Sequence, residues 1–289
     1  MNYRECWEKG KRTLAEKGIE EAELDARLLL EHVCGSNRND LLVHGDREVL
    51  PEQEAAYLSL TGRRGERIPL QYLTGVQEFM GLEFQVNEHV LIPRQDTEIL
   101  VEEAMRELRD GMDILDMCTG SGCILISLLH YSNDCTGLGI DISGDALKVA
   151  EKNAGSLLPP EKQVRFVESN LFDAVEGRFD MIVSNPPYIP SGVIDSLMPE
   201  VREHEPLGAL DGSEDGLYFY HKITEGCKEY LKPGGLLFYE IGCDQGAEVS
   251  EILARNGFGE IRVTKDYAGL DRVVSGVLCH AGTLSLGIS

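Results

Sequence analysis

Residues 113–130 read DILDMCTGSGCILISLLH, and this stretch decides the fold. A short apolar strand, residues 113–117, runs through a glycine-containing loop into an apolar helical pattern. Gly120 and Gly122 can adopt positive φ and allow a ligand close to the backbone. The loop lacks the full G-x-G-x-x-G spacing of dinucleotide-binding turns, because position 125 is Leu. The stretch predicts strand, loop and helix in an α/β sheet that binds a ligand.

An acidic residue, Asp141, ends the next predicted strand. It follows the glycines by about twenty residues, the usual distance for a carboxylate that accepts hydrogen bonds from ribose hydroxyls. A nucleoside-containing cofactor is therefore indicated, and the missing glycine disfavours a pyrophosphate. S-adenosylmethionine fits, because it has a ribose and an adenine but no phosphate, and Asp116 could bind its ammonium group directly or through water. The alternative for Asp141 is an N-cap of a helix at residues 143–153.

Four residues with unusual stiffness, Asn185-Pro186-Pro187-Tyr188, follow a third apolar strand at residues 179–184. Asparagine offers a side-chain carbonyl as an acceptor, and two prolines fix φ and remove two backbone donors. Tyrosine adds a flat face with a polar tip. Together they predict an acceptor pocket for a planar –NH2 group at the carboxyl end of a strand, where open α/β sheets place their sites. The alternative is a Pro-Pro turn that only ends the strand.

The composition indicates a folded, cytoplasmic protein. The chain has 289 residues, 42% of them apolar, and a net charge of −23 that disfavours tight binding to a nucleic acid duplex. One basic cluster, Arg63, Arg64 and Arg67, could bind phosphate locally despite this negative charge. The alternative is that it is only a solvated helix end. The eight cysteines include no C-x-x-C pair, which favours reduced thiols. No apolar stretch approaches the roughly twenty residues of a membrane span.

The chain divides into three predicted regions. Residues 1–72 read as a small all-helical domain in which Pro51 opens a helix. Residues 73–95 resemble a β-hairpin linker. In residues 96–283 strands alternate with helices, which predicts a doubly wound α/β sheet whose last two strands form an antiparallel edge pair. The seven predicted strands lie near 112–117, 136–141, 164–168, 179–184, 234–241, 259–264 and 273–279.

The motifs in this order resemble the release-factor glutamine methyltransferases, the HemK/PrmC group, over nearly the whole chain. The longer matching strings are IPLQYLTG at 68–75, VLIPRQDTE at 90–98, the segment 201–210 with Glu205-Pro206, and DGL at 215–217. The resemblance implies a Rossmann-like class I SAM-dependent methyltransferase sheet of seven strands behind a helical domain that helps to hold a release factor.

The implied reaction moves a methyl group from S-adenosyl-L-methionine to the side-chain amide nitrogen, N(5), of the glutamine in the Gly-Gly-Gln motif of class-1 peptide chain release factors. S-adenosyl-L-homocysteine is the implied product, and the implied role is to modulate translation termination. Neither membrane association nor direct DNA binding is expected. The resemblance implies that the cofactor contacts Asp116, Cys118, Thr119, Gly120, Ser121, Gly122, Asp141, Asn170, Leu171 and Asn185. It implies that the substrate glutamine, where the catalytic residues lie, contacts Asn185, Pro186, Pro187 and Tyr188.

Two segments depart from the family pattern. Gln95 stands where the family usually has Pro, which loosens that loop. Asn170 and Leu171 stand where an Asp and an aromatic residue often contact the adenine. Asn can still accept a hydrogen bond from the adenine amino group and Leu can still cover the ring, so we expect cofactor binding to survive, although more weakly.

The four-residue motif suggests a mechanism without a metal. We expect the Asn185 side-chain oxygen to accept one amide N–H and the Pro186 carbonyl to accept the other, which also stabilises positive charge developing on the nitrogen. Tyr188 is expected to pack on the flat amide and exclude water. Arg94, Thr97 and Glu98 border the site or, alternatively, form an N-capped helix start with a local ion pair.

Other classes of function share parts of this pattern. An enzyme that methylates a glutamine of a large-subunit ribosomal protein has the same pocket and glycine loop. An adenine amino-group methyltransferase uses the same acceptor pocket on a flipped base, but the charge and the lack of a basic recognition domain disfavour it. A nucleotide-binding oxidoreductase and a non-catalytic binding module fit the motifs less well.

Overall fold

The computed structural model describes residues 1–279, and contacts between its residues divide the chain into two compact units. The helical unit comprises Met1–Val76 together with Met198–His204. The sheet unit comprises Gln77–Leu197 and, among the described residues, Glu205–Cys279. The helical unit is therefore discontinuous in sequence, because it includes a short segment from the second half of the chain.

The sequence-based domain limits at 72 and 96, and the linker assignment for residues 73–95, stay predictions. Residues 280–283 of the expected last domain lie outside the described residues.

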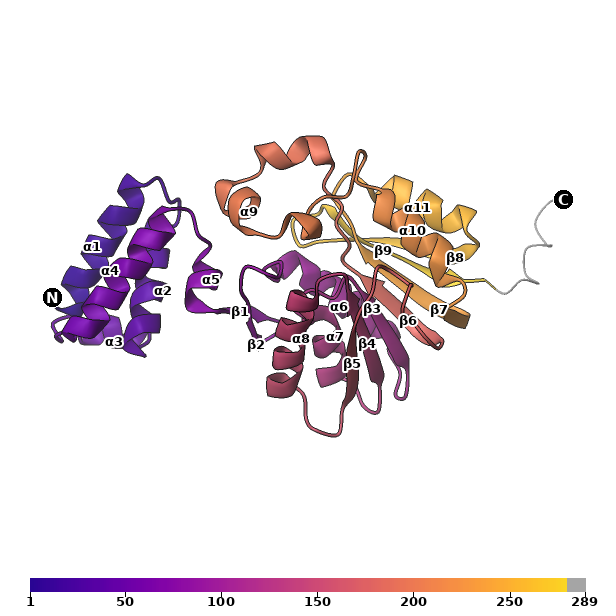
Figure 1. Ribbon diagram of the computed structural model, residues 1–289, viewed down its shortest axis with the longest axis horizontal. Coiled ribbons are helices and arrows are strands. Elements are labelled where there is room, and N and C mark those ends of the chain that lie inside the picture. The colour runs from indigo at the N-terminus through magenta and orange to yellow at the C-terminus, as the bar shows by residue number, and fades with distance from the viewer. Residues whose placement is uncertain (280–289) are drawn as a thin grey trace. The chain divides into compact units, whose positions relative to one another are not determined.

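The helices of the helical unit, labelled in Figure 1, begin at residues that the sequence marks as helix starts. Asn2 and Glu5 form a capping box at its first helix, with hydrogen bonds of 2.9 and 3.0 Å. Pro51 opens the fourth helix, as predicted. Leu29 and Tyr57 are fully buried in its core. Its helices are α1 (Tyr3–Glu16), α2 (Ala22–Cys34), α3 (Arg38–Val43), α4 (Pro51–Gly65), α5 (Leu70–Thr74) and α9 (Pro199–His204).

A buried ion-pair group joins α9 to the rest of the helical unit. Arg64 Nε donates to Asp25 Oδ2 at 2.7 Å, and Arg64 Nη1 donates to Glu200 Oε1 at 3.1 Å. Arg67 Nη1 donates to the same Glu200 oxygen at 3.1 Å. Although burial opposes the effect, hydrogen bonds from the backbone and from both arginines lower the pKa of Glu200. Arg64 is thus neither part of a free basic surface nor at a solvated helix end.

A two-stranded sheet forms where the sequence predicts a hairpin. Strands β1 (Val76–Phe79) and β2 (Leu82–Gln85) pair and are joined by two residues. Met80 and Gly81 both have positive φ, 52° and 72°, as a two-residue type I′ turn requires. The hairpin prediction is therefore confirmed.

The sheet unit is built on a seven-stranded sheet of order β5-β4-β3-β6-β7-β9-β8. Strands β3 to β7 are parallel, and β9 runs antiparallel to both of its neighbours. The chain order reverses between β3 and β6, which creates a crevice at their carboxyl ends. The strands are β3 (Asp113–Met117), β4 (Thr136–Asp141), β5 (Gln163–Glu168), β6 (Phe179–Ser184), β7 (Leu231–Glu240), β8 (Phe258–Lys265) and β9 (Asp271–Leu278).

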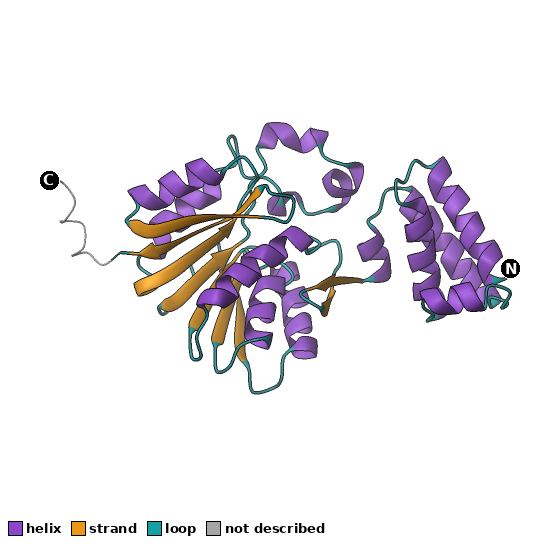
Figure 2. Ribbon diagram, turned by 180° about the vertical axis from the view of Figure 1, so that it is seen from behind, coloured by secondary structure: helices purple, strands orange, loops and turns teal. Residues whose placement is uncertain are grey.

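Helices cover both faces of this sheet (Figures 1 and 2). One face carries α6 (Gln95–Glu107), α7 (Cys123–His130) and α8 (Gly144–Leu157), and the other carries α10 (Tyr218–Cys227) and α11 (Gly246–Arg255). The seven strands, the antiparallel last pair and the preceding helical region confirm the predicted fold class.

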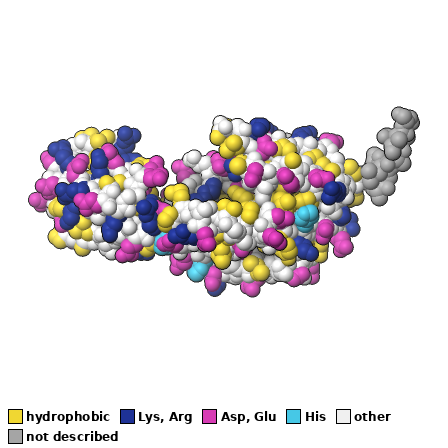
Figure 3. All heavy atoms as spheres, turned by 90° about the horizontal axis from the view of Figure 1, so that it is seen from above, with side chains coloured by type: hydrophobic (Ala, Val, Ile, Leu, Met, Phe, Trp, Pro, Cys, Tyr) yellow, Lys and Arg dark blue, Asp and Glu magenta, His cyan; other side chains and the backbone are white. Residues whose placement is uncertain are grey.

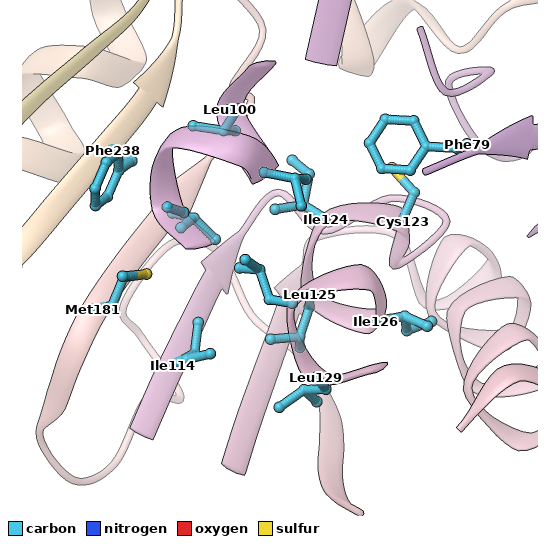
Figure 4. Packing of buried hydrophobic residues seen from close by; sticks show 14 of the residues in the cluster. Phe79, Leu100, Ile114, Cys123, Ile124, Leu125, Ile126, Leu129, Met181 and Phe238 are labelled. Carbon is cyan, nitrogen blue, oxygen red and sulfur yellow. The ribbon is translucent and has the colours of Figure 1, made fainter. Parts of the chain in front are cut away.

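Alternation along the strands separates two hydrophobic cores. In β3, Ile114 belongs to the core beneath α6 and α7, whereas its neighbour Leu115 belongs to the core beneath α10 and α11. Figure 4 shows side chains of α7, including Ile124 and Leu125, between Leu100 of α6 and the strands. Because both faces are covered, the central strands are apolar on both sides, which explains why short apolar runs predicted them.

Charged side chains of both signs are interspersed over the face seen in Figure 3, where hydrophobic side chains also gather on the sheet unit. Among the described residues, every helix is too short or too polar to cross a lipid bilayer.

Candidate active site

A cavity of about 290 Å³ lies at the carboxyl ends of β3, β4, β5 and β6, wholly within the sheet unit. This is the crevice at which open α/β sheets bind ligands. Its lining includes nine residues that the sequence singled out for the site: Cys118, Thr119, Gly120, Ser121, Asp141, Asn170, Leu171, Asn185 and Pro187. Four others, Asp116, Gly122, Pro186 and Tyr188, do not line it.

The two glycines of the loop after β3 have different roles. Gly120 has φ +54°, and no atom lies within 4 Å of the place where its Cβ would be, so its backbone borders open space in the cavity. A Cβ on Gly122 would instead lie 2.8 Å from Ile126 Cδ1 and 3.2 Å from Ala150 Cβ. Gly122 therefore allows α7 and α8 to pack closely, while Gly120 leaves room for a ligand.

Asp141 lies on the cavity wall and is held by two backbone donors. Gly120 N–H donates to its Oδ2 and Ser143 N–H to its Oδ1, each at 2.9 Å. The N-cap of α8 is Ser143, whose hydroxyl accepts from Ala146 N–H, so the alternative of Asp141 as that cap is wrong. Burial raises the pKa of Asp141, and the backbone donors oppose this. A carboxylate with two donors retains lone pairs that can accept from two ribose hydroxyls.

Asp116 lies beneath the loop and is fully buried. Its Oδ2 accepts from the Thr119 hydroxyl at 2.6 Å, whereas its Oδ1 has no hydrogen-bond partner among the described residues. Burial raises the pKa of Asp116 to about 7. Asp116 does not line the cavity itself, but Thr119, whose hydroxyl donates to it, does.

Apolar side chains form another part of the wall. Leu171 adopts a left-handed backbone conformation with φ +50°, and the hydroxyl of Ser169 donates to its carbonyl at 2.7 Å. Ile142 and Tyr218, both largely exposed, face the same cavity. This wall suits a flat aromatic ring, and together with Asp141 it fits a nucleoside. Burial and the nearby Asp141 and Asp116 raise the pKa of the Cys118 thiol in the loop.

The Asn-Pro-Pro-Tyr motif presents only part of itself to the cavity. Asn185 lines it and donates its Nδ2 to Thr97 Oγ1 at 3.4 Å. Tyr188 points away, because its hydroxyl donates to Glu240 Oε1 at 3.2 Å. The Tyr188 carbonyl accepts from Gln245 Nε2 at 3.0 Å. The expected packing of Tyr188 on a substrate amide therefore has no counterpart in the cavity lining, and the contacts of Tyr188 instead hold the end of the motif.

Glycines of the following loop brace the motif from outside. Ile189 forms a parallel bridge with Asp211. A Cβ on Gly212 would lie 2.7 Å from Tyr188 Cα, so the two backbones are in direct contact.

The segment before α6 supplies residues that the sequence placed only near the border. Arg94 and Thr97 line the cavity, whereas Glu98 accepts from Met80 N–H at 2.6 Å and does not line it. The helix begins at Gln95 with no side-chain cap, so Thr97 is a buried first-turn residue and the alternative of a capped start is wrong. Arg94 forms an ion pair with Glu205.

Two buried carboxylates contact residues that the sequence associated with the site, although neither lines the cavity: Glu205 pairs with Arg94, and Glu240 accepts from Tyr188. Glu205 stands in a string used only for the family resemblance, and Glu240 ends β7 and is fully enclosed. Burial raises the pKa of each, while Arg94 opposes the effect at Glu205. A charged residue at the end of a strongly apolar strand is the one sequence signal that could have indicated Glu240. Within residues 1–279 no His, Cys, Asp and Glu side chains are grouped to hold a metal ion.

Comparisons with known proteins agree with this arrangement. Residues 5–75 match the family model described as the PrmC N-terminal domain, and residues 95–198 match the methyltransferase small domain. A release factor glutamine methyltransferase of Geobacter sulfurreducens is 44% identical over 93% of this chain and 94% of its own length. One of Clostridium acetobutylicum is 43% identical over 88% and 90%. A methyltransferase structure from Pyrococcus furiosus, 17% identical, shares the fold with a TM-score of 0.52 over 80% of this chain and all of its own.

Proposed function

Because the chain belongs to the family of release factor glutamine methyltransferases, we propose that it methylates the side-chain amide nitrogen, N(5), of a glutamine in class-1 peptide chain release factors. The proposed target is the glutamine of the Gly-Gly-Gln motif, and the proposed consequence is a change in translation termination. One observation supports this proposal above the others: Asn185, whose side chain can accept from an amide N–H, lines the same cavity as Asp141.

The cavity fits S-adenosyl-L-methionine by its donor and acceptor chemistry. Asp141 is suited to the ribose hydroxyls, Leu171 and Ile142 to the adenine, and Gly120 leaves space beside the loop. The bound cofactor supplies an electrophilic methyl group and leaves as S-adenosyl-L-homocysteine. The proposed role of Asp116, buried beneath the loop, is to favour the ammonium end of the cofactor through Thr119, which lines the cavity, or through water.

The protein's contribution to the reaction is orientation and electrostatics. An amide nitrogen is a weak nucleophile because its lone pair is delocalised into the carbonyl. Asn185 Oδ1, on the cavity wall, accepts one N–H of the substrate and so helps to turn the nitrogen toward the methyl group. This acceptor stabilises the positive charge that grows on nitrogen, and the released proton passes to water. The Pro186 carbonyl, expected from the sequence as the second acceptor, does not line the cavity. Tyr188, held by Glu240 and Gln245, keeps the motif rigid.

The helical unit is proposed to contribute to holding the release factor, because residues 5–75 match the PrmC N-terminal domain. A release factor acts on the ribosome, so the proposed location is the cytoplasm. The excess of acidic over basic residues supports a protein substrate over a nucleic acid.

Transfer of labelled methyl tests the proposal. Purified release factor, large-subunit ribosomal protein and DNA are offered in parallel, together with a release factor whose Gly-Gly-Gln glutamine is replaced. Label on the intact release factor alone supports the proposed substrate. Label only on the ribosomal protein or the DNA overturns it.

The pocket assignment has its own test in the same assay. Asn185→Ala should abolish transfer while the dissociation constant for the cofactor, measured by calorimetry, stays within about twofold. Near-normal turnover in Asn185→Ala would contradict the assignment of Asn185 to the substrate pocket.

A further inference from the structure

A second cavity of the sheet unit, with a volume of about 620 Å³, lies at the edge of the seven-stranded sheet opposite the candidate active site. It is lined at the amino ends of β3 to β6, whereas the first cavity lies at their carboxyl ends. These strands have five or six residues, so about 16–20 Å separates the two edges. Among the described residues, none lines both cavities. The charged residues of the second cavity are Asp113, Lys162, Arg165, Glu176 and Arg178.

Two arginines of this second cavity lack the acidic partner that most arginines of the sheet unit have. Within the part of the chain that the structure describes, the guanidinium groups of Arg165 and Arg178 have neither an ion pair nor a hydrogen bond. Acidic residues outnumber basic ones in the chain by 50 to 27, so an arginine without an acidic partner is unusual here. Arg109 is the other such arginine of the sheet unit, and it does not line the cavity. The arginines that pair with an aspartate or a glutamate are Arg94, Arg106, Arg255, Arg262 and Arg272.

A lysine contributes a third positive charge to the second cavity. Lys162 directly precedes β5, and its Nζ donates to the backbone carbonyl of Ser132, which is a neutral acceptor. Within residues 1–279 it has no ion pair, so no carboxylate compensates its charge. An ammonium group carries three donors and a guanidinium group carries five. Since Arg165 lies in β5 and Arg178 directly precedes β6, these donors reach the cavity from the starts of two strands.

The acidic residues of the lining do not cancel these positive charges. Asp113 is already paired, because its Oδ2 accepts from Lys232 Nζ at 2.8 Å and its Oδ1 accepts from the Thr136 hydroxyl at 2.7 Å. The hydrogen bonds from Lys232 and Thr136 lower the pKa of Asp113. Glu176, in the loop before β6, is exposed and has no partner among the described residues. The lining therefore offers three cations without an acidic partner and one acid, Glu176, that opposes an anion.

We propose that this second cavity binds a small anion with at least two linked phosphate groups, of the pyrophosphate type. A guanidinium group forms a bidentate pair with one phosphate group, so Arg165 and Arg178 together match two of them, and Lys162 adds a point charge. The net charge of −23 repels every anion at long range, so the binding energy comes from these donors at contact. The proposal is independent of the proposed function, because the two cavities share no lining residue within the described chain.

Calorimetric titration of the full chain with inorganic pyrophosphate and, separately, with inorganic phosphate tests the ligand class. Pyrophosphate should bind at least about tenfold more tightly, because only the linked pair can engage both guanidinium groups. A pyrophosphate affinity no higher than that for phosphate overturns the proposal. Adenosine triphosphate distinguishes the two sources of linked phosphates: tighter binding than pyrophosphate supports a nucleotide as the ligand, and weaker binding supports the free anion. Neither cofactor nor release factor is needed, so failure of the proposed methyl transfer leaves this test unaffected.

Substitutions of single charged residues test the location of the site. Arg165→Gln and Arg178→Gln should each weaken pyrophosphate binding by about 10- to 100-fold, since each removes charge-assisted hydrogen bonds. Arg109→Gln is the matched control, because it removes the same charge from an exposed, unpaired arginine outside the cavity. Glu176→Gln should instead tighten binding by about two- to fivefold, because it removes the opposing charge.

The urea midpoint of unfolding, measured for all four variants, should stay at the wild-type value, because each side chain is exposed. An equal loss of pyrophosphate affinity in Arg109→Gln, or unchanged affinity in both cavity variants, overturns the proposal.

Discussion

Gly216 packs directly on the backbone of Tyr188: a Cβ atom at position 216 would lie 2.3 Å from the Tyr188 carbonyl oxygen. Gly216 also has φ +75°, a conformation that residues with a Cβ rarely adopt. The same carbonyl accepts from Gln245, so the end of the four-residue motif is held from two sides. The position of Asn185 therefore depends on a glycine thirty-one positions later in the chain.

Gly216→Ala should lower methyl transfer and destabilise the fold by about 1–3 kcal/mol, the usual result of forcing a group into a filled space. Urea unfolding and kcat are the two measurements. Gly177→Ala is the matched control, because Gly177 also has positive φ, +95°, but open space where its Cβ would be. Equal effects in the two variants would mean that backbone strain, and not contact with Tyr188, limits position 216.

Asp141→Asn should weaken cofactor binding by about 10- to 100-fold, because an amide presents an N–H group where the carboxylate has two charged acceptors. Calorimetric titration with S-adenosyl-L-methionine measures this. Asp145→Asn provides the control, since Asp145 is an exposed acid in the first turn of α8, paired with Lys148 and outside the cavity. An unchanged affinity in Asp141→Asn would reject the ribose role.

Asp116 should make stability depend on pH near neutrality. Burial raises its pKa from 3.8 to about 7, so the folded chain keeps a proton that the unfolded chain releases. Its contribution to the free energy of unfolding therefore falls as the pH rises from about 4 to about 7, by at most about 4 kcal/mol for a pKa difference of about 3. Asp141, Glu205 and Glu240 contribute in the same direction, so Asp116→Asn should reduce this slope, and not remove it, in urea unfolding at a series of pH values.

Asp113 of the same strand gives the opposite sign and serves as the control for that experiment. Hydrogen bonding to Lys232 lowers its pKa, so its contribution is present above pH 4 and is lost only below it. Asp113→Asn should leave the slope between pH 4 and pH 7 intact. Parallel curves for wild type and Asp116→Asn would contradict the assignment of the raised pKa to Asp116.

Glu200→Gln should destabilise the helical unit at neutral pH by about 1–3 kcal/mol, because two arginines lose a charged acceptor. The pKa of Glu200 is lowered, so its contribution is present above the ordinary glutamate range and disappears as the pH falls below it. Fluorescence of Trp7, the one tryptophan in the chain, reports unfolding of this unit. Glu203→Gln, at an exposed ion pair with Arg202, is the control and should show little change.

The sheet was predictable because its strands are short apolar runs buried on both faces and bounded by turns. The place of Asp141 on the cavity wall was predictable as well, because its distance from the glycines in sequence is set by one strand–helix–strand repeat. The direction of Tyr188 was not, since it depends on Glu240 and Gln245, which come from later elements and carry no spacing signal. Gly122 was grouped with the ligand loop because sequence does not show that Ile126 and Ala150 fill the space beside it.

The association of residues 198–204 with the helical unit has a consequence for synthesis on the ribosome. The first 76 residues leave the ribosome early, with Arg64 and Arg67 in place but without Glu200. That partner emerges only after β6 and the Asn-Pro-Pro-Tyr motif have been translated. Until Glu200 has been translated, Arg64 and Arg67 therefore lack this carboxylate partner. By then β3 to β6 of the sheet have been synthesised, so the helical unit can be completed only after most of the residues that line the cavity have been made.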